Sequence, residues 1–534
     1  MSEGAPWWRG ATVYQVYVRS FADSNGDGVG DFAGLISKLE YIAALGVDAI
    51  WLSPIHPSPN RDWGYDVSDY NTVNTEYGSE ADFDRLLRES HARGLKIMTD
   101  EVLAHTSDEH AWFVESLGGG DKAGWYVWAP PREDGTPPNN WLSAFGGPAW
   151  SYHPARRACY HHKFLRQQPK LNWCDAGARA AALNVLDSWL KRGVDGFRLD
   201  VANAFLHDAA LRDNPAVPQS ERNGRYWARA ANMQWHRHDS NLEENVQVLN
   251  EIRTRVERYA GRFVMGEFSE DPERCGAFAS PSEGLHSGYS FPLLLASVLG
   301  PDFVREQYAM LARFPAHWPS IAFSNHDVIR TLTRFGGENA PPALARLLLA
   351  LLVSLKGTLL LYQGEELGLP EAALRRNQIR DPIGDLYYPL YRGRDGCRTP
   401  MPWDDAAPNL GFTIGTPWLP LAPEHRALAV ALQERDPQST LSYARRLLTA
   451  RRSSDALRLG DIEFLDAPPP VLTFLRTHEH ERMLCVFNMS DDESSFQSTF
   501  VPNAAPLSLC TGGSRIDNEV LSLRPYAAFF ASVA

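Results

Sequence analysis

The sequence predicts an α/β protein: a (β/α)8 TIM barrel with an inserted loop-rich domain after strand 3 and a C-terminal antiparallel β domain. Two observations predict this fold class. Amphipathic helices alternate along the chain with short, continuous apolar segments, which is typical of parallel strands covered by helices. Acidic side chains also follow several of these segments, as expected where the strands of a barrel end. A doubly wound open sheet is the alternative arrangement of the same elements.

A unit of helix, glycine and apolar strand recurs along the chain. In its first copy, apolar side chains from Phe32 to Leu45 recur every three or four residues, the spacing of one buried helix face. Gly46 is expected to end this helix, and residues 49–52 to form the strand after it. The second copy opens with a capping-box pattern at Ser79. The later strands are expected at 95–98, 196–199, 263–265 and 358–361, after helices that end near Gly94, Gly193, Gly261 and Gly357. Residues 13–17 and 320–323 also resemble strands, which brings the number close to the eight of a barrel.

Two segments depart from this pattern. Residues 105–173 are rich in Trp, Pro, Gly and Asn and lack long helical periodicity, so we expect an insertion there. Residues 471–475 and 483–487 are short apolar strands between polar turns, typical of an antiparallel sheet. The predicted domains are the barrel at 1–104 and 174–455, the insertion at 105–173 and the C-terminal domain at 456–534.

Composition excludes several classes of protein. The 534 residues include 52 Lys and Arg against 65 Asp and Glu, a formal net charge of −13 that argues against a nucleic-acid partner. Six cysteines without a CxxC pattern predict neither a disulfide framework nor a zinc site. The N-terminus lacks the features of a signal peptide, and the longest apolar run, 347–353, is too short to span a membrane. We therefore expect a soluble, cytoplasmic protein that is a monomer or a homodimer.

Polar side chains follow four of the predicted strands. The C-terminal ends of barrel strands meet at one mouth, where function is usually found. Carboxylates held together there are costly unless function retains them. Two carboxylates, one attacking an anomeric carbon and one protonating the leaving oxygen, suit glycosidic chemistry. The sequence shows neither a Gly-x-Ser-x-Gly elbow nor a phosphate-binding glycine loop. The side chains at these strand ends are Asp100, His105, Arg198, Asp200, Glu267, His326 and Asp327.

Several strings carry a family resemblance. The chain resembles the α-amylase superfamily (glycoside hydrolase family 13), in its α-glucosidase and oligo-1,6-glucosidase branch. Each string alone is not specific for this family. Their occurrence in the family's order, from near the N-terminus to beyond residue 400, is specific for it. The strings are Asp62-Trp-Gly-Tyr-Asp66, Gln168-Pro-Lys-Leu-Asn172, Gly196-Phe-Arg-Leu-Asp200, Gly266-Glu267, Ser324-Asn-His-Asp327, Tyr362-Gln-Gly-Glu-Glu366 and Gly393-Arg-Asp-Gly-Cys-Arg-Thr-Pro-Met-Pro-Trp403.

The resemblance implies three catalytic carboxyl groups and no organic cofactor. Asp200 would be the nucleophile that forms a β-glucosyl-enzyme. Glu267 would be the general acid and then the general base. Asp327 would bind the 2- and 3-hydroxyls of the sugar and help to distort its ring. Arg198 would hold Asp200 ionised, because residues two apart on a strand share a face.

The resemblance also implies a blind pocket for one glucose. His105 and His326 would donate hydrogen bonds to its hydroxyls, and Tyr65 would stack on its ring. Asp62 and Arg398 would bind the terminal hydroxyls and make the enzyme exo-acting. Asp66 and Arg394 are neighbours that could be confused with that pair. Phe164 is a candidate for an apolar wall, and equally a residue of the loop core.

A loop with alternating Asp and Asn predicts a site for a hard cation. Their side-chain oxygens face one point, and Gly28 permits the turn, although Gly34 replaces the last acidic ligand of an EF-hand. Similar loops in the resembling family bind one structural Ca2+ or Mg2+, with the carbonyl of Val29 as a ligand. A solvated turn is the alternative. The expected ligands are Asp23, Asn25, Asp27, Val29 and Asp31.

Some positions depart from the family pattern. Ala104 and Lys170 stand where oxygen ligands are usual, so the second calcium site typical of α-amylases is expected to be missing. Val201 follows the nucleophile, and in the resembling branch a valine at this position tends to occur with a preference for α-1,6 linkages. The Gly393 string and residues 203–208, in contrast, resemble α-glucosidases that act on maltose, sucrose or aryl glucosides. One methyl-sized difference in a pocket is worth about 1–3 kcal/mol, enough to bias a preference.

These observations predict a retaining α-glucosidase with some transglucosylation, acting on small α-glucosides. The alternatives are an oligo-1,6-glucosidase, or a sucrose isomerase or α-glucosyltransferase on the same scaffold. A non-catalytic relative of the kind that accompanies amino-acid transporters is disfavoured, because all three carboxyl groups are present and no membrane helix precedes the barrel.

Overall fold

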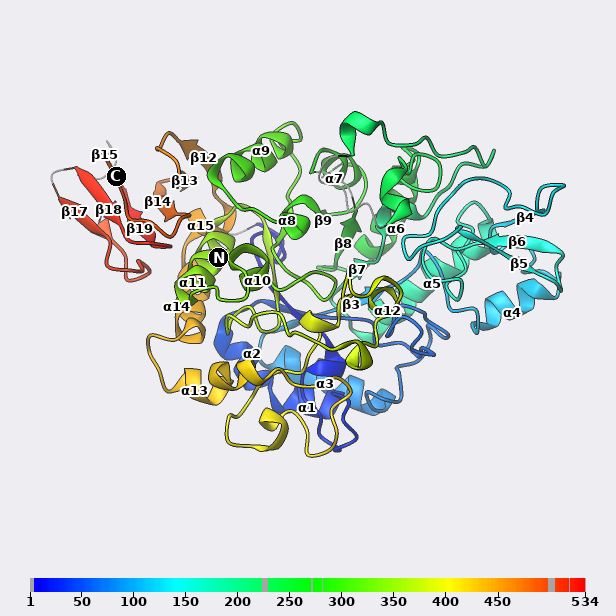
Figure 1. The fold of residues 1–534 in the computed structure, drawn as a ribbon, viewed down its shortest axis with the longest axis horizontal. Coiled ribbons are helices and arrows are strands. Elements are labelled where there is room, and N and C mark those ends of the chain that lie inside the picture. The colour runs from blue at the N-terminus through cyan, green and yellow to red at the C-terminus, as the bar shows by residue number, and fades with distance from the viewer. Residues whose placement is uncertain are drawn as a thin grey trace.

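Eight parallel strands form the central sheet of the computed structural model, in the order β10-β11-β1-β2-β3-β7-β8-β9. The two outer strands come together, since the hydroxyls of Ser287 on β9 and Ser320 on β10 lie 2.8 Å apart. The predicted barrel is therefore confirmed as a nearly closed sheet (Figure 1). Its strands are β1 Thr12–Val16, β2 Ala49–Leu52, β3 Lys96–Glu101, β7 Gly196–Leu199, β8 Phe263–Phe268, β9 Ser287–Ser290, β10 Ser320–Ala322 and β11 Thr358–Tyr362. The structure describes residues 4–222, 229–269, 272–280, 282–497, 505–517 and 519–533.

Helices follow the strands and cover the outside of the barrel. Ser79 and Asp82 form the predicted capping box at the start of α3, and Gly46 and Gly193 end α2 and α5 at positive φ (87° and 114°). The helix predicted from Phe32 to Leu45 is two helices, because the backbone at Lys38 leaves helical geometry (φ −108°, ψ 5°). The helices are α1 Phe32–Ser37, α2 Leu39–Leu45, α3 Glu80–Ala92, α4 Ala111–Leu117, α5 Ala176–Arg192, α6 Asn245–Glu257, α7 Pro272–Phe278, α8 Pro292–Leu295, α9 Pro301–Leu311, α10 Thr331–Gly336, α11 Pro342–Ser354, α12 Pro382–Tyr387, α13 Val430–Glu434, α14 Thr440–Ser453 and α15 Asp455–Leu459.

Side chains alternate between the two faces of the barrel strands. One set packs against the helices, as Ile50, Ile97 and Val264 do. The other set forms a separate cluster inside the barrel, which includes Trp51 and Met98. This alternation decides which polar side chains reach the mouth of the barrel.

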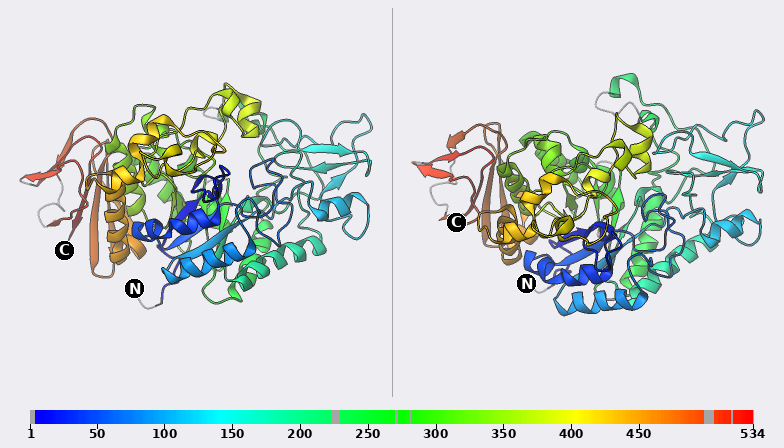
Figure 2. Two further views of the ribbon diagram at one scale, coloured as in Figure 1. Left: turned by 90° about the horizontal axis from the view of Figure 1, so that it is seen from below. Right: turned by 60° about the horizontal axis from the view of Figure 1, so that its bottom comes forward.

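Two smaller parts lie at opposite ends of the molecule (Figures 1 and 2). Within residues 105–173, expected to be irregular, β4 Trp128–Ala129, β5 Trp150–His153 and β6 Ala158–His161 form a small antiparallel sheet beside α4. The C-terminal part is antiparallel, as predicted, with strands ordered β12-β13-β14-β19-β16 and β15-β18-β17. Their bounds are β12 Asp461–Leu465, β13 Val471–His478, β14 Glu481–Asn488, β15 Ser494–Gln497, β16 Ala505–Pro506, β17 Arg515–Asp517, β18 Val520–Leu523 and β19 Ala528–Ser532.

Two further irregular segments extend from the barrel. One follows β7, with short 3-10 turns, and the other lies between β11 and α13 and carries α12. Across the described ranges, no helix has the length and apolar character needed to cross a lipid bilayer.

Candidate active site

Three neighbouring strands bring charged side chains into the barrel mouth. Asp100 on β3 and Glu267 on β8 each stand two positions beyond a methionine of the interior cluster, and Arg198 lies between them on β7. The guanidinium of Arg198 is fully buried, with Nη1 2.7 Å from Asp100 Oδ1 and Nη2 2.6 Å from Glu267 Oε1. Strand register therefore places two carboxyl groups on one guanidinium.

Asp200 joins the same group from the turn after β7. Its Oδ1 lies 2.8 Å from Arg198 Nη1, and its side chain is buried. Burial raises the pKa of Asp200 well above its usual range, Arg198 opposes that rise, and the charge of Glu267 adds to it. Burial likewise raises the pKa of Asp100 to about 7. Because three carboxyl groups share one cation, full ionisation of the cluster is opposed.

Asp327 lies beside this cluster, in the loop after β10. Its Oδ1 accepts hydrogen bonds from Arg398 at 2.7 Å and from Arg394 at 3.2 Å. Burial acts to raise the pKa of Asp327, but His326, Arg394 and Arg398 together hold it below its usual range. Asp327 is therefore an anion in this site.

Asp62 closes the far side of the site, with Arg394 as its partner. Asp62 Oδ1 lies 2.6 Å from Arg394 Nη2, whereas Asp66 accepts hydrogen bonds from the backbone of its own loop at Arg61 and Asp62. The choice of Asp62 over Asp66 agrees with this geometry. Arg398, expected to bind the terminal hydroxyls together with Asp62, forms an ion pair with Asp327, and its contact with the sugar stays a prediction.

Tyr65 and His105 line the site beside Asp62. The Tyr65 hydroxyl donates to Asp100 Oδ2 at 2.9 Å, and its ring stacks on His326 at 5.0 Å. His105 Nε2 lies 2.9 Å from the carbonyl oxygen of Tyr65, so this nitrogen carries the proton and donates. Burial lowers the pKa of His105 to about 4, which leaves the other ring nitrogen as an acceptor. The donation from His105 to a sugar hydroxyl stays a prediction. Phe164 packs at 5.3 Å from the His105 ring and is half-buried.

His326 is held in the opposite tautomer. The side-chain amide of Gln15 donates to its Nδ1 at 2.8 Å, because an amide NH2 cannot accept. Burial lowers the pKa of His326 well below its usual range. The neutral ring therefore carries its proton on Nε2, which has no hydrogen-bond partner among the described residues and faces Asp327 Oδ2 at 3.3 Å. Donation from this nitrogen to a sugar hydroxyl stays a prediction.

The loop predicted to hold a cation forms a chain of turns. Asp23 accepts from the backbone N–H groups of Gly26 and Gly28, and Asp27 from that of Val29. Asn25 Oδ1 accepts from the N–H of Asp27, and Asp31 caps α1. Within the described ranges, no three His, Cys, Asp or Glu side chains converge as metal ligands do. The oxygen-only donor set fits Ca2+ or Mg2+, and the metal remains a prediction.

Lys170 occupies the junction between the inserted segment and the loop after β7. Its ammonium group is buried and donates to the carbonyl oxygens of Ala204 and Phe205. Burial lowers the pKa of Lys170 to about 7. The lysine thus links two segments through their backbone, at the position where the sequence departs from the family pattern.

Tyr289 and Gln168 are polar neighbours of the site that the sequence patterns did not indicate. Tyr289 lies on β9, whose Ser-Gly-Tyr-Ser sequence has no apolar run to mark a strand. Its hydroxyl lies 3.1 Å from Glu267 Oε1. Gln168 donates to Asp62 Oδ2 at 3.0 Å, and although its motif was noted, no role was assigned to it. Asp381, the N-cap of α12, was also missed and accepts two hydrogen bonds from the Arg394 side chain.

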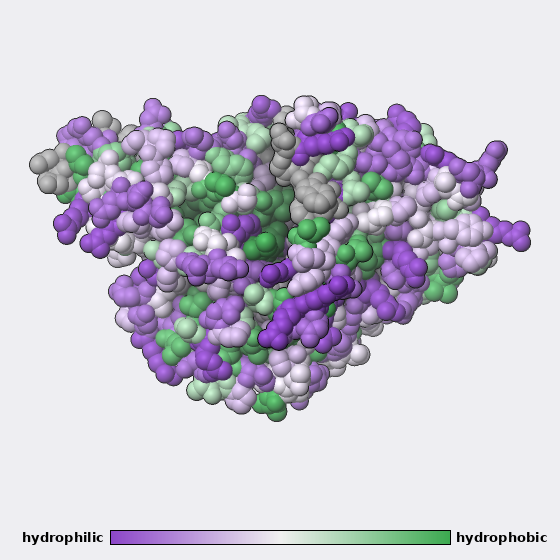
Figure 3. Space-filling model, viewed as in Figure 1, coloured by the Kyte–Doolittle hydropathy of each residue, from purple (hydrophilic) through white to green (hydrophobic). Residues whose placement is uncertain are grey.

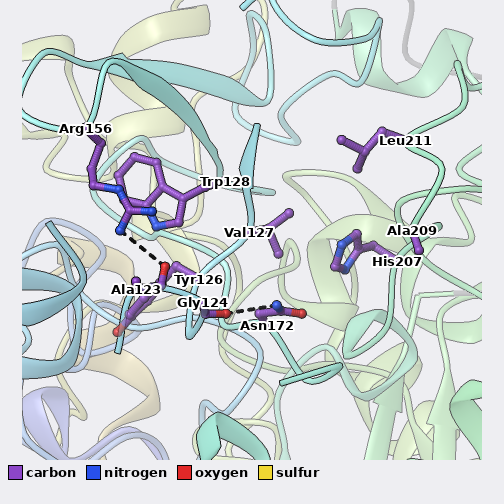
Figure 4. A pocket seen from close by; sticks show the side chains of 10 residues that line it. All are labelled: Ala123, Gly124, Tyr126, Val127, Trp128, Arg156, Asn172, His207, Ala209 and Leu211. Atoms are coloured by element: carbon purple, nitrogen blue, oxygen red, sulfur yellow. Dashed lines mark hydrogen bonds between the residues drawn. The ribbon is translucent and has the colours of Figure 1, made fainter. Parts of the chain in front are cut away.

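A separate cavity of about 460 Å3 lies between the inserted segment and the loop after β7 (Figure 4). Trp128 and Arg156 lie on one side of it, and His207 and Leu211 on the other. No residue predicted for the site lines it. On the face shown in Figure 3, polar side chains cover most of the outline, and apolar side chains gather around a hollow near the middle.

Comparison with known proteins gives consistent matches. A family model described as the catalytic domain of alpha amylase matches residues 15–460. A "Probable alpha-glucosidase" of Rhizobium meliloti (strain 1021) is 45% identical, over 99% of this chain and 97% of its own. An oligo-1,6-glucosidase of Heyndrickxia coagulans is 35% identical, over 92% of this chain and 93% of its own. The crystal structure of the alpha-glucosyl transfer enzyme XgtA has a TM-score of 0.96 and 47% identity, over 99% of this chain and 100% of that one.

Proposed function

The chain belongs to the α-amylase family of glycoside hydrolases, and from that membership we propose that it is a retaining, exo-acting α-glucosidase. It releases α-glucose from the non-reducing end of short α-glucosides, such as maltose, sucrose or aryl glucosides, with some transglucosylation. The relative named as an α-glucosidase, matched over nearly its full length, supports this substrate class.

One observation carries the mechanism: Arg198 holds Asp200 and Glu267 on a single guanidinium. Retaining glycosidases need two carboxyl groups about 5–5.5 Å apart, one as nucleophile and one as acid. Asp200 attacks the anomeric carbon of glucose, while Glu267 gives its proton to the departing glycosidic oxygen. In the second step Glu267 takes a proton from water, whose oxygen displaces Asp200 and restores the α-anomer.

The other charged groups bind the glucose. Asp327, kept ionised by Arg394 and Arg398, accepts hydrogen bonds from the 2- and 3-hydroxyls. The Nε2–H of His326 donates to a hydroxyl of the same sugar. Asp62, paired with Arg394, binds the terminal hydroxyls together with Arg398. Because the Asp62–Arg394 pair closes the inner end of the glucose pocket, only the terminal glucose of a sugar chain enters it, which makes the enzyme exo-acting.

Transfer of glucose to another hydroxyl is the second candidate function. The similarity to the transfer enzyme XgtA favours it. The chemistry is shared, since a sugar or alcohol hydroxyl takes the place of water in the second step. An oligo-1,6-glucosidase remains a third form of the same mechanism, supported by the relative of that name and by Val201.

The remaining predictions belong to the same proposal. A structural Ca2+ or Mg2+ held by the loop 23–31 would stabilise that loop and take no part in bond cleavage, and no organic cofactor is required. The partners are small α-glucosides, with neither nucleic acid nor membrane. The enzyme is cytoplasmic and is a monomer or a homodimer.

A time course on maltose, isomaltose, sucrose and trehalose tests the proposal, with NMR identifying the anomer first released. Release of α-glucose from maltose or sucrose is expected. Release mainly from isomaltose would make the enzyme an oligo-1,6-glucosidase, and lengthened or isomerised sugars would make it a transferase. Initial release of β-glucose, or no turnover of any substrate, would contradict the proposal.

A further inference from the structure

Tyr289 connects the arginine of the site to its acid. Its side chain is 1% exposed and points into the barrel from β9, with its ring 6.3 Å from that of Trp51. We propose that Tyr289 is a positioning residue for Glu267, which fixes the rotation of the carboxyl group so that Oε2 carries the proton given to the leaving oxygen. This inference rests on the function proposed above.

The hydrogen bonds of the Tyr289 hydroxyl leave it one orientation. Arg198 donates to its oxygen twice, from Nε at 3.1 Å and from Nη2 at 3.0 Å. An arginine has no acceptor, so both lone pairs of the hydroxyl are used. Its single hydrogen must therefore point to the remaining partner, Glu267 Oε1, at 3.1 Å. Burial raises the pKa of Tyr289 well above its usual range, so the hydrogen is retained.

The two oxygens of Glu267 are consequently not equivalent. Oε1 accepts from Tyr289 and lies 2.6 Å from Arg198 Nη2, so the phenol hydrogen and the guanidinium cation both face it. Among the described residues, Oε2 accepts only the backbone N–H of Val201, at 3.2 Å. A carboxyl proton on Oε1 would face the Tyr289 hydrogen and the guanidinium cation, whereas on Oε2 it would face one longer contact with a neutral backbone N–H. The acid proton is therefore assigned to Oε2.

Val201 supports the same orientation from the other side. It is a β-branched residue at φ 45°, a conformation that such residues rarely adopt. Its backbone N–H lies 3.2 Å from Glu267 Oε2. The acid is thus held by a side chain from β9 and a backbone group after β7.

The variant Tyr289→Phe tests this role with two substrates. Maltose needs protonation, because the electron pair of the broken C1–O bond remains on a poor leaving oxygen. α-Glucosyl fluoride needs much less, because fluoride departs as an anion. In both cases kcat/KM reports the first step, attack by Asp200. We expect kcat/KM for maltose to fall by about 10- to 100-fold and that for the fluoride by less than about threefold.

The controls separate positioning from stability. The ratio of the two kcat/KM values is taken within one preparation, so it does not depend on how much of the variant has folded. Tyr443→Phe is the matched variant, since Tyr443 is equally buried and its hydroxyl donates to the Leu509 carbonyl, outside the site. It should leave the ratio unchanged. In a Glu267→Gln background, Tyr289→Phe should reduce kcat/KM for maltose by less than about twofold.

Three results would overturn the proposal. An equal loss of kcat/KM on both substrates would mean that Tyr289 acts through Arg198 or only supports the fold. An unchanged kcat/KM for maltose would mean that Tyr289 does not position the acid. A large additional loss in the Glu267→Gln background would show that it acts elsewhere. If the unmodified enzyme turns over neither substrate, the proposed function itself fails, and this inference with it.

Discussion

Asp62 and Arg394 form an ion pair of 2.6 Å although 332 residues separate them in the sequence. The same guanidinium also binds Asp381 at 2.7 Å and Asp327 at 3.2 Å. Arg394 therefore ties the loop after β2 to the loops after β10 and β11. It links the far wall of the pocket to one of the three proposed catalytic carboxyl groups.

Replacing Arg394 with lysine should weaken substrate binding. A lysine ammonium cannot present the planar fork that reaches these carboxylates together. We expect Arg394→Lys to raise KM for maltose by about tenfold or more, with a smaller change in kcat. Steady-state kinetics measure both values. Arg392→Lys, two residues earlier and exposed, is the control that should retain normal kinetics. An unchanged KM in Arg394→Lys would show that this residue does not contribute to substrate binding.

Asp200→Asn should abolish turnover while preserving the fold. The amide cannot act as the nucleophile, and loss of such a group costs about 10^4-fold or more. Because the neutral amide places no negative charge against Glu267 and Asp100, the melting temperature should stay the same or rise. The measurement is kcat on maltose beside a thermal melt. Asp187→Asn, at a helix surface where it pairs with Arg255, is the control. Near-normal turnover in Asp200→Asn would refute the assignment.

The regular parts of the barrel were predictable because local patterns agree with the tertiary fold. Apolar runs such as residues 49–52 match β2, and glycine stops such as Gly46 are found where expected. β9 was missed because Ser and Gly give no apolar signal, and Tyr289 was missed with it. The sequence does not distinguish Arg394 from Arg398 as the ion-pair partner of Asp62, because the two arginines are close together in the chain. The folded loop directs Arg394 to Asp62 and Arg398 to Asp327. Side-chain pairing across hundreds of residues is a tertiary property.

Removal of divalent cations should lower stability more than catalytic rate. A metal bound only to the folded loop at 23–31 stabilises the native state in proportion to its occupancy. We expect excess chelator to lower the melting temperature by several degrees with little immediate change in initial rate. Asp27→Asn is the sharpest variant, because asparagine can still accept from the N–H of Val29 but brings no charge to the cation. Its melting temperature should no longer respond to chelator. A proportional loss of rate at constant melting temperature would instead indicate a catalytic metal.

Buried neutral histidines should make the enzyme sensitive to acid, and His425 offers a clean test. Its side chain is fully buried, with Nε2 2.9 Å from the carbonyl oxygen of Pro370, and burial lowers its pKa to about 3. Between the unfolded pKa of about 6.5 and this folded value, the unfolded chain takes up a proton that the folded chain refuses. The free energy of unfolding therefore decreases as pH falls through that window.

The expected contribution of His425 is a loss of about 2 kcal/mol between pH 7 and pH 5. In His425→Gln the unfolding free energy, measured by urea denaturation at both pH values, should depend on pH less by that amount. His480→Gln changes an exposed histidine in the turn between β13 and β14 and should leave the dependence as it is in the unmodified enzyme. If His425→Gln shows the full dependence, His425 is not the neutral group that its burial indicates. The loss at pH 5 would then have to come from other buried histidines, such as His317, whose pKa burial lowers to about 4.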